Sequence, residues 1–140
     1  MSFKIRLATS ADVRRLSELR LAVLENVLRF RNSVTLDHYL WFVTNSEVWV
    51  ADVNGHIAGF SAADPRDGSI FALFIEEQYH GRGWGRALLA AACATLIRCG
   101  HTDAKLTTMP GTRAEGFYRA LGWIDTGTSE KGEIIFRIGL

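Results

Sequence analysis

The N-terminal part of the chain alternates between apolar and polar positions in two different periods. Residues 3–8 alternate every second position, as a short strand does. Thr9 and Asp12 then match the capping box that opens a helix. Apolar residues recur at three- and four-residue spacing from Leu16 to Val27, which is the period of one apolar helix face. A second helix is predicted over residues 35–43.

The middle of the chain has the pattern of adjacent strands. Residues 48–53 and 57–63 read as two strands, and the Asn54-Gly55 pair between them suits a type I′ hairpin turn. Residues 70–75 are apolar at every position, which is expected of a central strand covered on both faces. The pattern therefore predicts an antiparallel hairpin followed by a buried strand.

Helices and strands alternate in the remaining part of the chain. A long helix is predicted over residues 84–98 with Gly100 as its stop, followed by a strand over 104–108. A short helix over 114–121 and a final strand pair over 123–138 complete the order. This order predicts an α/β (α+β) fold with a mixed sheet and one right-handed parallel strand-helix-strand crossover.

Composition limits the classes of protein that fit. The 140 residues suit one domain spanning 1–140, and 48% hydrophobic with 22% charged residues excludes a disordered chain. A net charge of +1 argues against nucleic-acid or membrane partners, and no apolar run reaches the roughly 18 residues of a membrane span, so a cytoplasmic location is expected. The four histidines lie on separate predicted elements, and Cys93 and Cys99 have no zinc or disulfide spacing. We expect packed cysteines and no metal.

A glycine-rich turn lies between the predicted central strand and the long helix. Residues 80–86 read His-Gly-Arg-Gly-Trp-Gly-Arg, and free backbone N–H groups at such a helix start bind phosphates. Arg82 and Arg86 add cations, although a tight turn with solvated arginines explains the same letters. A dinucleotide fingerprint fails because Leu88 stands where its third glycine belongs, and a P-loop fails because Gly-Lys-Ser/Thr is absent.

Two motifs in this half of the chain resemble those of the GNAT acetyltransferase superfamily. Gly83 and Gly85 match the small positions of its Arg/Gln-x-x-Gly-x-Gly/Ala signature, whereas His80 departs from the leading position. Residues 114–123 resemble the second signature, Ala-x-x-Phe/Leu-Tyr-x-x-x-Gly-Phe. The resemblance covers nearly the whole chain. It implies a mostly antiparallel, twisted sheet flanked by helices, with the parallel crossover at the cofactor site.

The resemblance also implies acetyl-CoA as the acetyl donor and coenzyme A as product. The central strand would splay from the next one, and Phe74 and Ile75 would offer backbone groups to the pantetheine arm in the gap. The pyrophosphate would be held by the amides of Gly81, Arg82, Gly83, Trp84, Gly85 and Arg86. Arg113 is placed near the cofactor channel, with simple exposure as the alternative.

Two residues are candidates for the chemistry. Tyr118 matches the family tyrosine that assists departure of the thiolate, and its alternative is a core aromatic. Glu76 directly follows the central strand and is the first candidate for the general base, with Glu25 and Asp64 in reserve. The alternative for Glu76 is a solvated loop carboxylate.

The acceptor has no motif of its own. Tyr39 and Trp41 on the second helix, together with Glu25 on the first, are expected to line the acceptor pocket. The predicted function is transfer of acetyl to a primary amine of a small molecule or peptide by direct attack. A non-catalytic acyl-CoA sensor is the alternative, modification of protein or transfer-RNA-bound amines is not excluded, and a homodimer is left open.

Overall fold

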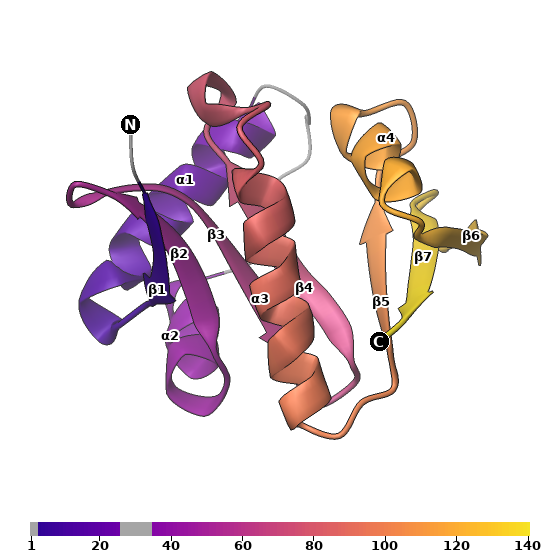
Figure 1. Cartoon of the computed structure of the whole chain (residues 1–140), viewed down its shortest axis with the longest axis horizontal. Helices are drawn as coiled ribbons and strands as arrows, with labels where there is room; N and C mark the ends of the chain where they lie inside the picture. The colour runs from indigo at the N-terminus through magenta and orange to yellow at the C-terminus, as the bar shows by residue number, and fades with distance from the viewer. Residues whose placement is uncertain (1–2, 26–34) are drawn as a thin grey trace.

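The computed structural model describes residues 3–25 and 35–140, with the side chains of residues 23–25 left aside. One seven-stranded sheet forms the centre of this described part (Figure 1). Its strands are β1 (Lys4–Leu7), β2 (Val48–Val53), β3 (His56–Asp64), β4 (Ser69–Ile75), β5 (Asp103–Thr108), β6 (Ile124–Thr128) and β7 (Ile134–Gly139). The helices are α1 (Val13–Glu25), α2 (Leu36–Asn45), α3 (Trp84–Arg98) and α4 (Arg113–Ala120), with short 3-10 turns η1 (Ser10–Asp12) and η2 (Glu77–Tyr79).

The strand order is β1-β2-β3-β4-β5-β7-β6, which puts β4 at the centre. Every neighbouring pair is antiparallel except β4 and β5, which are parallel and are joined by the crossover helix α3. Figure 1 shows α3 in front of the sheet, α1 and α2 behind it, and α4 beside β5 and β7. The mixed, mostly antiparallel sheet predicted from the sequence is therefore confirmed.

Local sequence signals position these elements. β2 has the predicted bounds, and its hairpin turn places Asn54 at φ 53° and Gly55 at φ 89°, the left-handed values that a type I′ turn requires. Gly100, with φ 91°, follows α3 as predicted, and the Thr112 hydroxyl accepts a hydrogen bond from the Glu115 N–H at the start of α4.

Three apolar clusters fill the two faces of the sheet. Leu16 and Leu19 of α1, 0% and 1% exposed, pack with α2 against Phe60 on one face. On the other face, Trp84 and Leu88 of α3 pack against β2 and β3. The rest of α3 shares a third cluster with α4, β5 and β7. Side chains of β4 take part in all three clusters, so the helices pack against β4 from both faces of the sheet.

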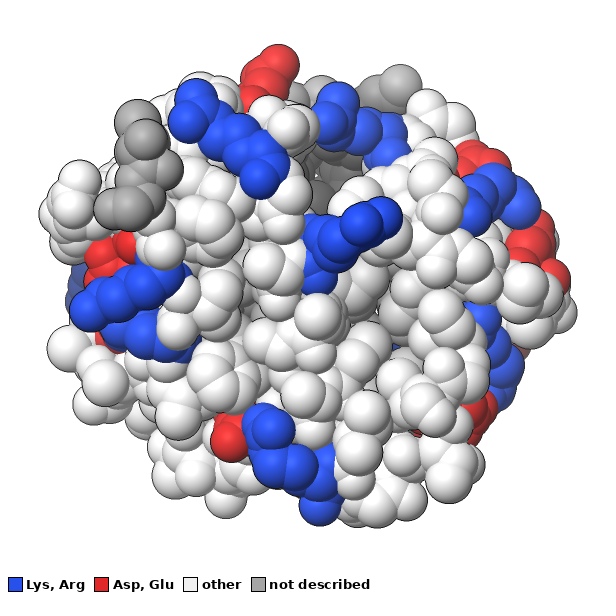
Figure 2. Space-filling model, in the orientation of Figure 1, with Lys and Arg blue, Asp and Glu red and all other residues white. Residues whose placement is uncertain are grey.

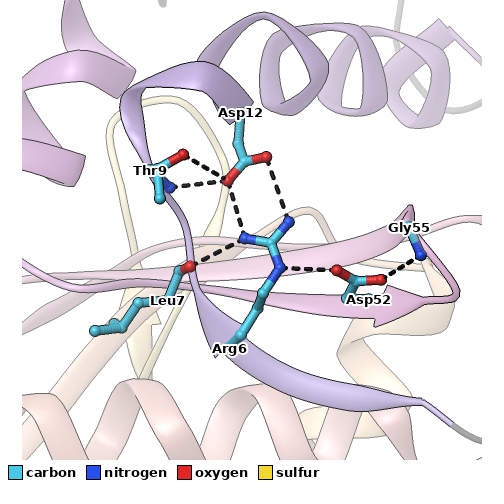
Figure 3. A network of polar contacts seen from close by, with 6 residues as sticks. All are labelled: Arg6, Leu7, Thr9, Asp12, Asp52 and Gly55. Carbon is cyan, nitrogen blue, oxygen red and sulfur yellow. Dashed lines mark hydrogen bonds and ion pairs between the residues drawn. The ribbon is translucent and has the colours of Figure 1, made fainter.

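A charged network ties the N-terminal strand to the hairpin. Arg6 donates to Asp52 Oδ2 at 2.8 Å and to Asp12 Oδ2 at 3.0 Å, as Figure 3 shows. Thr9 N–H donates to the same Asp12 oxygen at 2.8 Å, and Gly55 N–H donates to Asp52 Oδ1 at 2.7 Å. The hydrogen bonds from Arg6 and Gly55 lower the pKa of Asp52 below its usual range. β1, the start of α1 and the β2–β3 turn are therefore fixed by one arginine.

Two expectations about burial were wrong. Cys99 is exposed rather than packed, because it caps α3 at the end of the helix, and only Cys93 is partly buried. β4 is not covered along its whole length: Ile70 and Ala72 are buried, whereas Leu73, Phe74 and Ile75 remain partly open. The open residues lie where β4 and β5 separate. Within the described residues, no helix is long and apolar enough to cross a membrane.

Candidate active site

The site begins with a gap in the sheet between β4 and β5. The two strands share a single residue pair, Ser69 with Lys105, and Lys105 N–H donates to Gly68 O at 3.1 Å. Beyond this point they part, and a cavity of about 680 Å³ lies between them. Its walls are residues 70–75 of β4 and 106–109 of the β5 end, closed by the turn before α3 and by α4. The splayed central strand implied by the family resemblance is present.

The register of β4 shows which backbone groups face the gap. Glu76 N–H donates to Ala58 O at 2.9 Å, on the β3 side. Antiparallel pairing alternates, so the backbone groups of Phe74 also point to β3, whereas those of Leu73 and Ile75 point toward β5. The register therefore favours Ile75 and Leu73, rather than Ile75 and Phe74, as partners for an extended ligand arm. Phe74 contributes its side chain to the cavity wall.

The glycine-rich turn presents a bare helix start to the cavity. Gly81 and Gly83 have φ values of 79° and 83°, and Gly83 is the N-cap residue of α3 without a capping side chain. Ala87 N–H bonds back to Gly83 O at 3.1 Å, so the N–H groups of the preceding residues 84–86 are the ones that α3 cannot satisfy. No acidic residue lies in the first turn. The positive end of the helix is thus left for an anion.

Gly85 allows the turn to sit tightly against the rest of the site. A Cβ at this position would lie 3.2 Å from Ile75 Cδ1 and 3.5 Å from Phe117 Cζ. His80, the departure from the family motif, has Nε2 3.2 Å from the Ile75 carbonyl oxygen. The turn is therefore packed against the end of β4 and the side of α4, whereas a Cβ on Gly83 would meet nothing within 4 Å.

Basic side chains surround the mouth of the cavity. Arg86 and Arg113 are exposed and line it, and Arg82, on the same turn, lies over the rings of Tyr79 and Trp84 at 5.4 and 5.8 Å. Figure 2 shows Lys and Arg side chains gathered around a hollow at the end of the molecule where α3 begins. Because the net charge of the chain is only +1, these basic side chains create a local site for an anion and not a positive field over the whole protein.

Tyr118 lies at the wall of the cavity on α4. It is 6% exposed, and its ring packs at 5.7 Å from Trp123 and 5.9 Å from Phe136. Its hydroxyl group has no hydrogen-bond partner within residues 3–25 and 35–140. Burial, with a smaller contribution from Cys93, raises the pKa of Tyr118 above its usual value. The Tyr118 ring therefore packs in the core while the residue also lines the cavity. Its hydroxyl stays protonated and able to donate a hydrogen bond at physiological pH.

The predicted carboxylates do not reach the cavity. Glu76 Oε1 lies 2.5 Å from His56 Nε2 and its Oε2 3.4 Å from Arg15 Nη2, so Glu76 belongs to a charged cluster outside the cavity lining. Asp64 pairs with Arg66 at 2.9 Å, which lowers the pKa of Asp64. The side chain of Glu25, the third predicted carboxylate, lies outside the described residues. The structure does not bring Glu76 and Asp64 together in the cavity.

Two of the residues predicted for the acceptor pocket lie elsewhere. Tyr39 is 1% exposed and packs edge-on against Phe60 in the core, and Trp41 lies under the Arg66 guanidinium at 3.9 Å. Neither lines the cavity. Arg20 and Glu133 do line the cavity, and neither was predicted from the sequence.

The two missed residues gave different signals in the sequence. Arg20 occupies the apolar face of its helix, four residues after Leu16, and this misplaced cation was the available signal. Glu133 had none, because it reaches the cavity only through the pairing of β5 with β7. No group of three metal-ligating side chains occurs among the described residues.

Comparisons with solved structures agree with this geometry. The chain resembles yncA of Salmonella typhimurium, determined with acetyl-CoA, at 20% identity and a TM-score of 0.80 over 100% of this chain and 95% of that one. It resembles the PaiA N-acetyltransferase of Thermoplasma acidophilum, in complex with coenzyme A, at 15% identity and 0.85 over 100% of both. A GNAT acetyltransferase of Streptococcus pneumoniae matches at 22% identity and 0.78 over 99% of both. These likenesses show a shared fold.

Sequence comparison identifies the family. No curated protein sequence matches the chain. The family model described as the acetyltransferase (GNAT) domain matches residues 44–125, from the end of α2 to the start of β6. This match covers more than half of the chain and includes the split sheet, the glycine-rich turn and the tyrosine helix. The chain belongs to the GNAT acetyltransferase family.

Proposed function

We propose that this protein is an N-acetyltransferase that moves an acetyl group from acetyl-CoA to a primary amine of a small molecule or peptide by direct attack. The observation that carries the proposal is the cavity between β4 and β5. It has an uncapped helix start at its mouth and, in its wall, a tyrosine hydroxyl without a hydrogen-bond partner among the described residues. The proposal treats residues 1–140 as one catalytic domain acting in the cytoplasm, and leaves the oligomeric state to measurement.

The cavity fits the donor in three respects. Its volume of about 680 Å³ lies in the range of small-molecule sites. The unsatisfied N–H groups of residues 84–86 suit a pyrophosphate, with Arg86 and Arg113 as nearby cations. The backbone groups of Leu73 and Ile75 suit an extended amide arm that adds to the sheet edge.

Acetyl-CoA would supply an activated acetyl group as a thioester. The Ile75 N–H, directed into the gap, is positioned to donate to the carbonyl oxygen as negative charge develops there. The Tyr118 hydroxyl would donate a hydrogen bond to the departing sulfur. A tyrosine pKa of about 10 against a thiol pKa of about 8.5 makes full proton transfer unfavourable by roughly 2 kcal/mol, and the raised pKa of Tyr118 increases that cost. Hydrogen bonding to the thiolate is therefore the proposed role.

The amine must lose a proton before it attacks. Glu76 stays a candidate base only through its position after β4, because His56 and Arg15 already hold its carboxylate. Glu133 lines the cavity, and its Oε2 accepts a weak hydrogen bond from Thr107 at 3.4 Å. We include Glu133 as the second candidate, with an ordered water chain as the route if neither carboxylate acts.

The test is release of free coenzyme A thiol from acetyl-CoA in the presence of a panel of amines, with acetylated product identified by mass. Turnover with at least one amine supports the enzyme. Stabilisation by acetyl-CoA without turnover of any amine would favour the alternative, a non-catalytic sensor module. Neither stabilisation nor turnover would refute the donor assignment.

A further inference from the structure

Arg20 is a buried cation for which the described residues provide no counter-charge. It lies on α1, is 9% exposed, and lines the cavity. Its Nε and Nη1 atoms are buried and have no hydrogen-bond partner in the described part of the chain. No aspartate or glutamate forms an ion pair with Arg20 among the described residues, whereas Arg6 and Arg66 both pair with aspartates.

The surroundings of Arg20 compensate its charge only in part. Its guanidinium carbon lies 5.0 Å from the ring centroid of Phe74 and 5.8 Å from that of Phe71. Aromatic faces attract a cation but accept no strong N–H hydrogen bond. The Tyr39 hydroxyl lies beside the guanidinium but makes no hydrogen bond of normal geometry. Burial raises the pKa of Tyr39 against the opposing effect of Arg20, so this neighbour stays neutral and offers no negative charge.

A buried, unpaired guanidinium destabilises a fold. Such a residue at a cavity wall makes sense if a bound ligand supplies the anion that pairs with it. The position identifies which ligand. α1 lies behind the sheet and α3 in front of it (Figure 1). The rings of Phe71 and Phe74, which the Arg20 guanidinium faces, pack against the cluster formed with α1 and α2, so Arg20 lines the cavity from the α1 side of the sheet. Its aromatic neighbour Phe74 directly precedes Ile75, whose N–H is assigned to the acetyl carbonyl. The anion beside Arg20 therefore belongs to the acceptor.

We propose that Arg20 binds a carboxylate of the acceptor, so that the preferred substrates are amino acids or similar amines that carry a carboxylate within a few bonds of the reacting nitrogen. This inference rests on the proposed acetyltransferase function and specifies its substrate class. The planar fork of guanidinium donors matches a carboxylate better than a lysine ammonium does. An apolar amine would leave the cation unpaired and would bind less well for that reason.

The experiment compares matched acceptors with matched variants. The acceptors are the L-amino acids, the corresponding amino acid amides, the decarboxylated amines, and aminoalkyl phosphonates. The variants are Arg20→Met, which keeps the length of the side chain without charge, and Arg20→Lys, which keeps the charge without the fork. Thiol release gives kcat/KM for each pair, and melting curves with coenzyme A present give binding of each acceptor without any need for turnover.

The wild-type protein should prefer the carboxylate over its amide by about 100-fold in kcat/KM, since hydrogen bonds to a charged group are lost with the amide. Arg20→Met should abolish that preference while leaving the coenzyme A-induced shift in melting temperature unchanged. Arg20→Lys should restore part of it. Arg20→Met should also melt at an equal or higher temperature than wild type, because it removes an unpaired buried charge.

Each of the following results would overturn the assignment. Amides used as well as carboxylates would show that Arg20 does not select the acceptor, while the acetyltransferase function would stand. A lower melting temperature for Arg20→Met, with turnover of every amine reduced equally, would make Arg20 a structural cation. A preference for phosphonates would identify a phosphate-bearing acceptor instead. If no amine is acetylated, the proposed function fails, and carboxylate-induced stabilisation that persists in Arg20→Met would then refute the Arg20 site separately.

Discussion

Replacing Tyr118 with phenylalanine tests the proposed chemistry at a single atom. Hydrogen bonds to a charged group contribute about 1.5–3 kcal/mol. At about 1.36 kcal/mol per tenfold change in rate, the loss of one such bond in the transition state lowers kcat by roughly 10- to 150-fold. The KM for acetyl-CoA should stay nearly constant, because the bond forms to the departing sulfur and not to the bound thioester.

The structure also predicts that this variant folds. The Tyr118 hydroxyl has no partner among the described residues, so its removal leaves no buried polar group unpaired. The ring contacts with Trp123 and Phe136 are kept. The melting temperature at neutral pH should therefore equal or slightly exceed that of wild type.

Tyr39→Phe is the matched control. Tyr39 is also buried and its hydroxyl also makes no hydrogen bond of normal geometry, but it lies in the core beside Arg20 and does not line the cavity. Any effect that passes through Arg20 should therefore fall on acceptor binding and not on kcat at saturating acceptor. Removal of the Tyr39 hydroxyl should leave kcat at saturating acceptor within about threefold. The assay is thiol release under saturation, with acetyl-CoA affinity measured by thermal shift. An unchanged kcat in Tyr118→Phe, or an equal loss in both variants, would remove Tyr118 from the mechanism.

Three further substitutions separate local roles. Gly83→Ala and Gly55→Ala impose the same left-handed strain in open space, about 1–2 kcal/mol each by chemical denaturation, but only Gly83→Ala should weaken coenzyme A binding; equal binding in both would contradict the amide cradle. Asp52→Asn should lower the free energy of unfolding by about 1 kcal/mol at pH 7. The arginine hydrogen bond depresses the pKa of Asp52, so its stabilisation exists above the unfolded pKa near 4 and is lost as pH falls; wild type and Asp52→Asn should converge near pH 3, and a constant difference would refute this. Glu133→Gln and Glu76→Gln test the base: the variant that flattens the acidic limb of the kcat–pH profile identifies it, and unchanged profiles in both leave a water chain.

Much of the fold could be predicted because its signals are local. Alternation and turn residues gave the bounds of β2 and its hairpin, and helical spacing with a following glycine gave α3. The glycine-rich turn was predictable for the same reason, since a strand, three glycines and a helix start are adjacent in the sequence. The position of Tyr118 beside the cavity needed the family motif, because α4 alone has the pattern of any short amphipathic helix.

The remaining parts depend on contacts between distant segments. The end of β4 is partly exposed because β5 pairs with β7 along its length and with β4 at only one residue pair. The apolar sequence of β4 does not specify this pairing. Glu76 was expected beside the thioester because it follows β4, but His56, across the β3–β4 pairing, and Arg15 on α1 hold its carboxylate. Tyr39 was predicted from its helix to line a pocket, yet the helix turns it toward Phe60.

Three features at the cavity destabilise the ligand-free fold, and each one is a group that the proposed substrates could satisfy. The gap beside β4 leaves the backbone groups of Ile75 without a neighbouring strand, the start of α3 lacks a capping side chain, and Arg20 has no anionic partner in the described part of the chain. Each feature disfavours the ligand-free fold, and each is of a kind that one part of the reacting pair could satisfy: an amide arm, a pyrophosphate and a carboxylate. Because all three adjoin one cavity, donor and acceptor should each stabilise the same arrangement of β4, α1 and α3. The two ligands should therefore bind with positive coupling, and a coenzyme A affinity that is unaffected by saturating acceptor would show that the two ends of the cavity act independently.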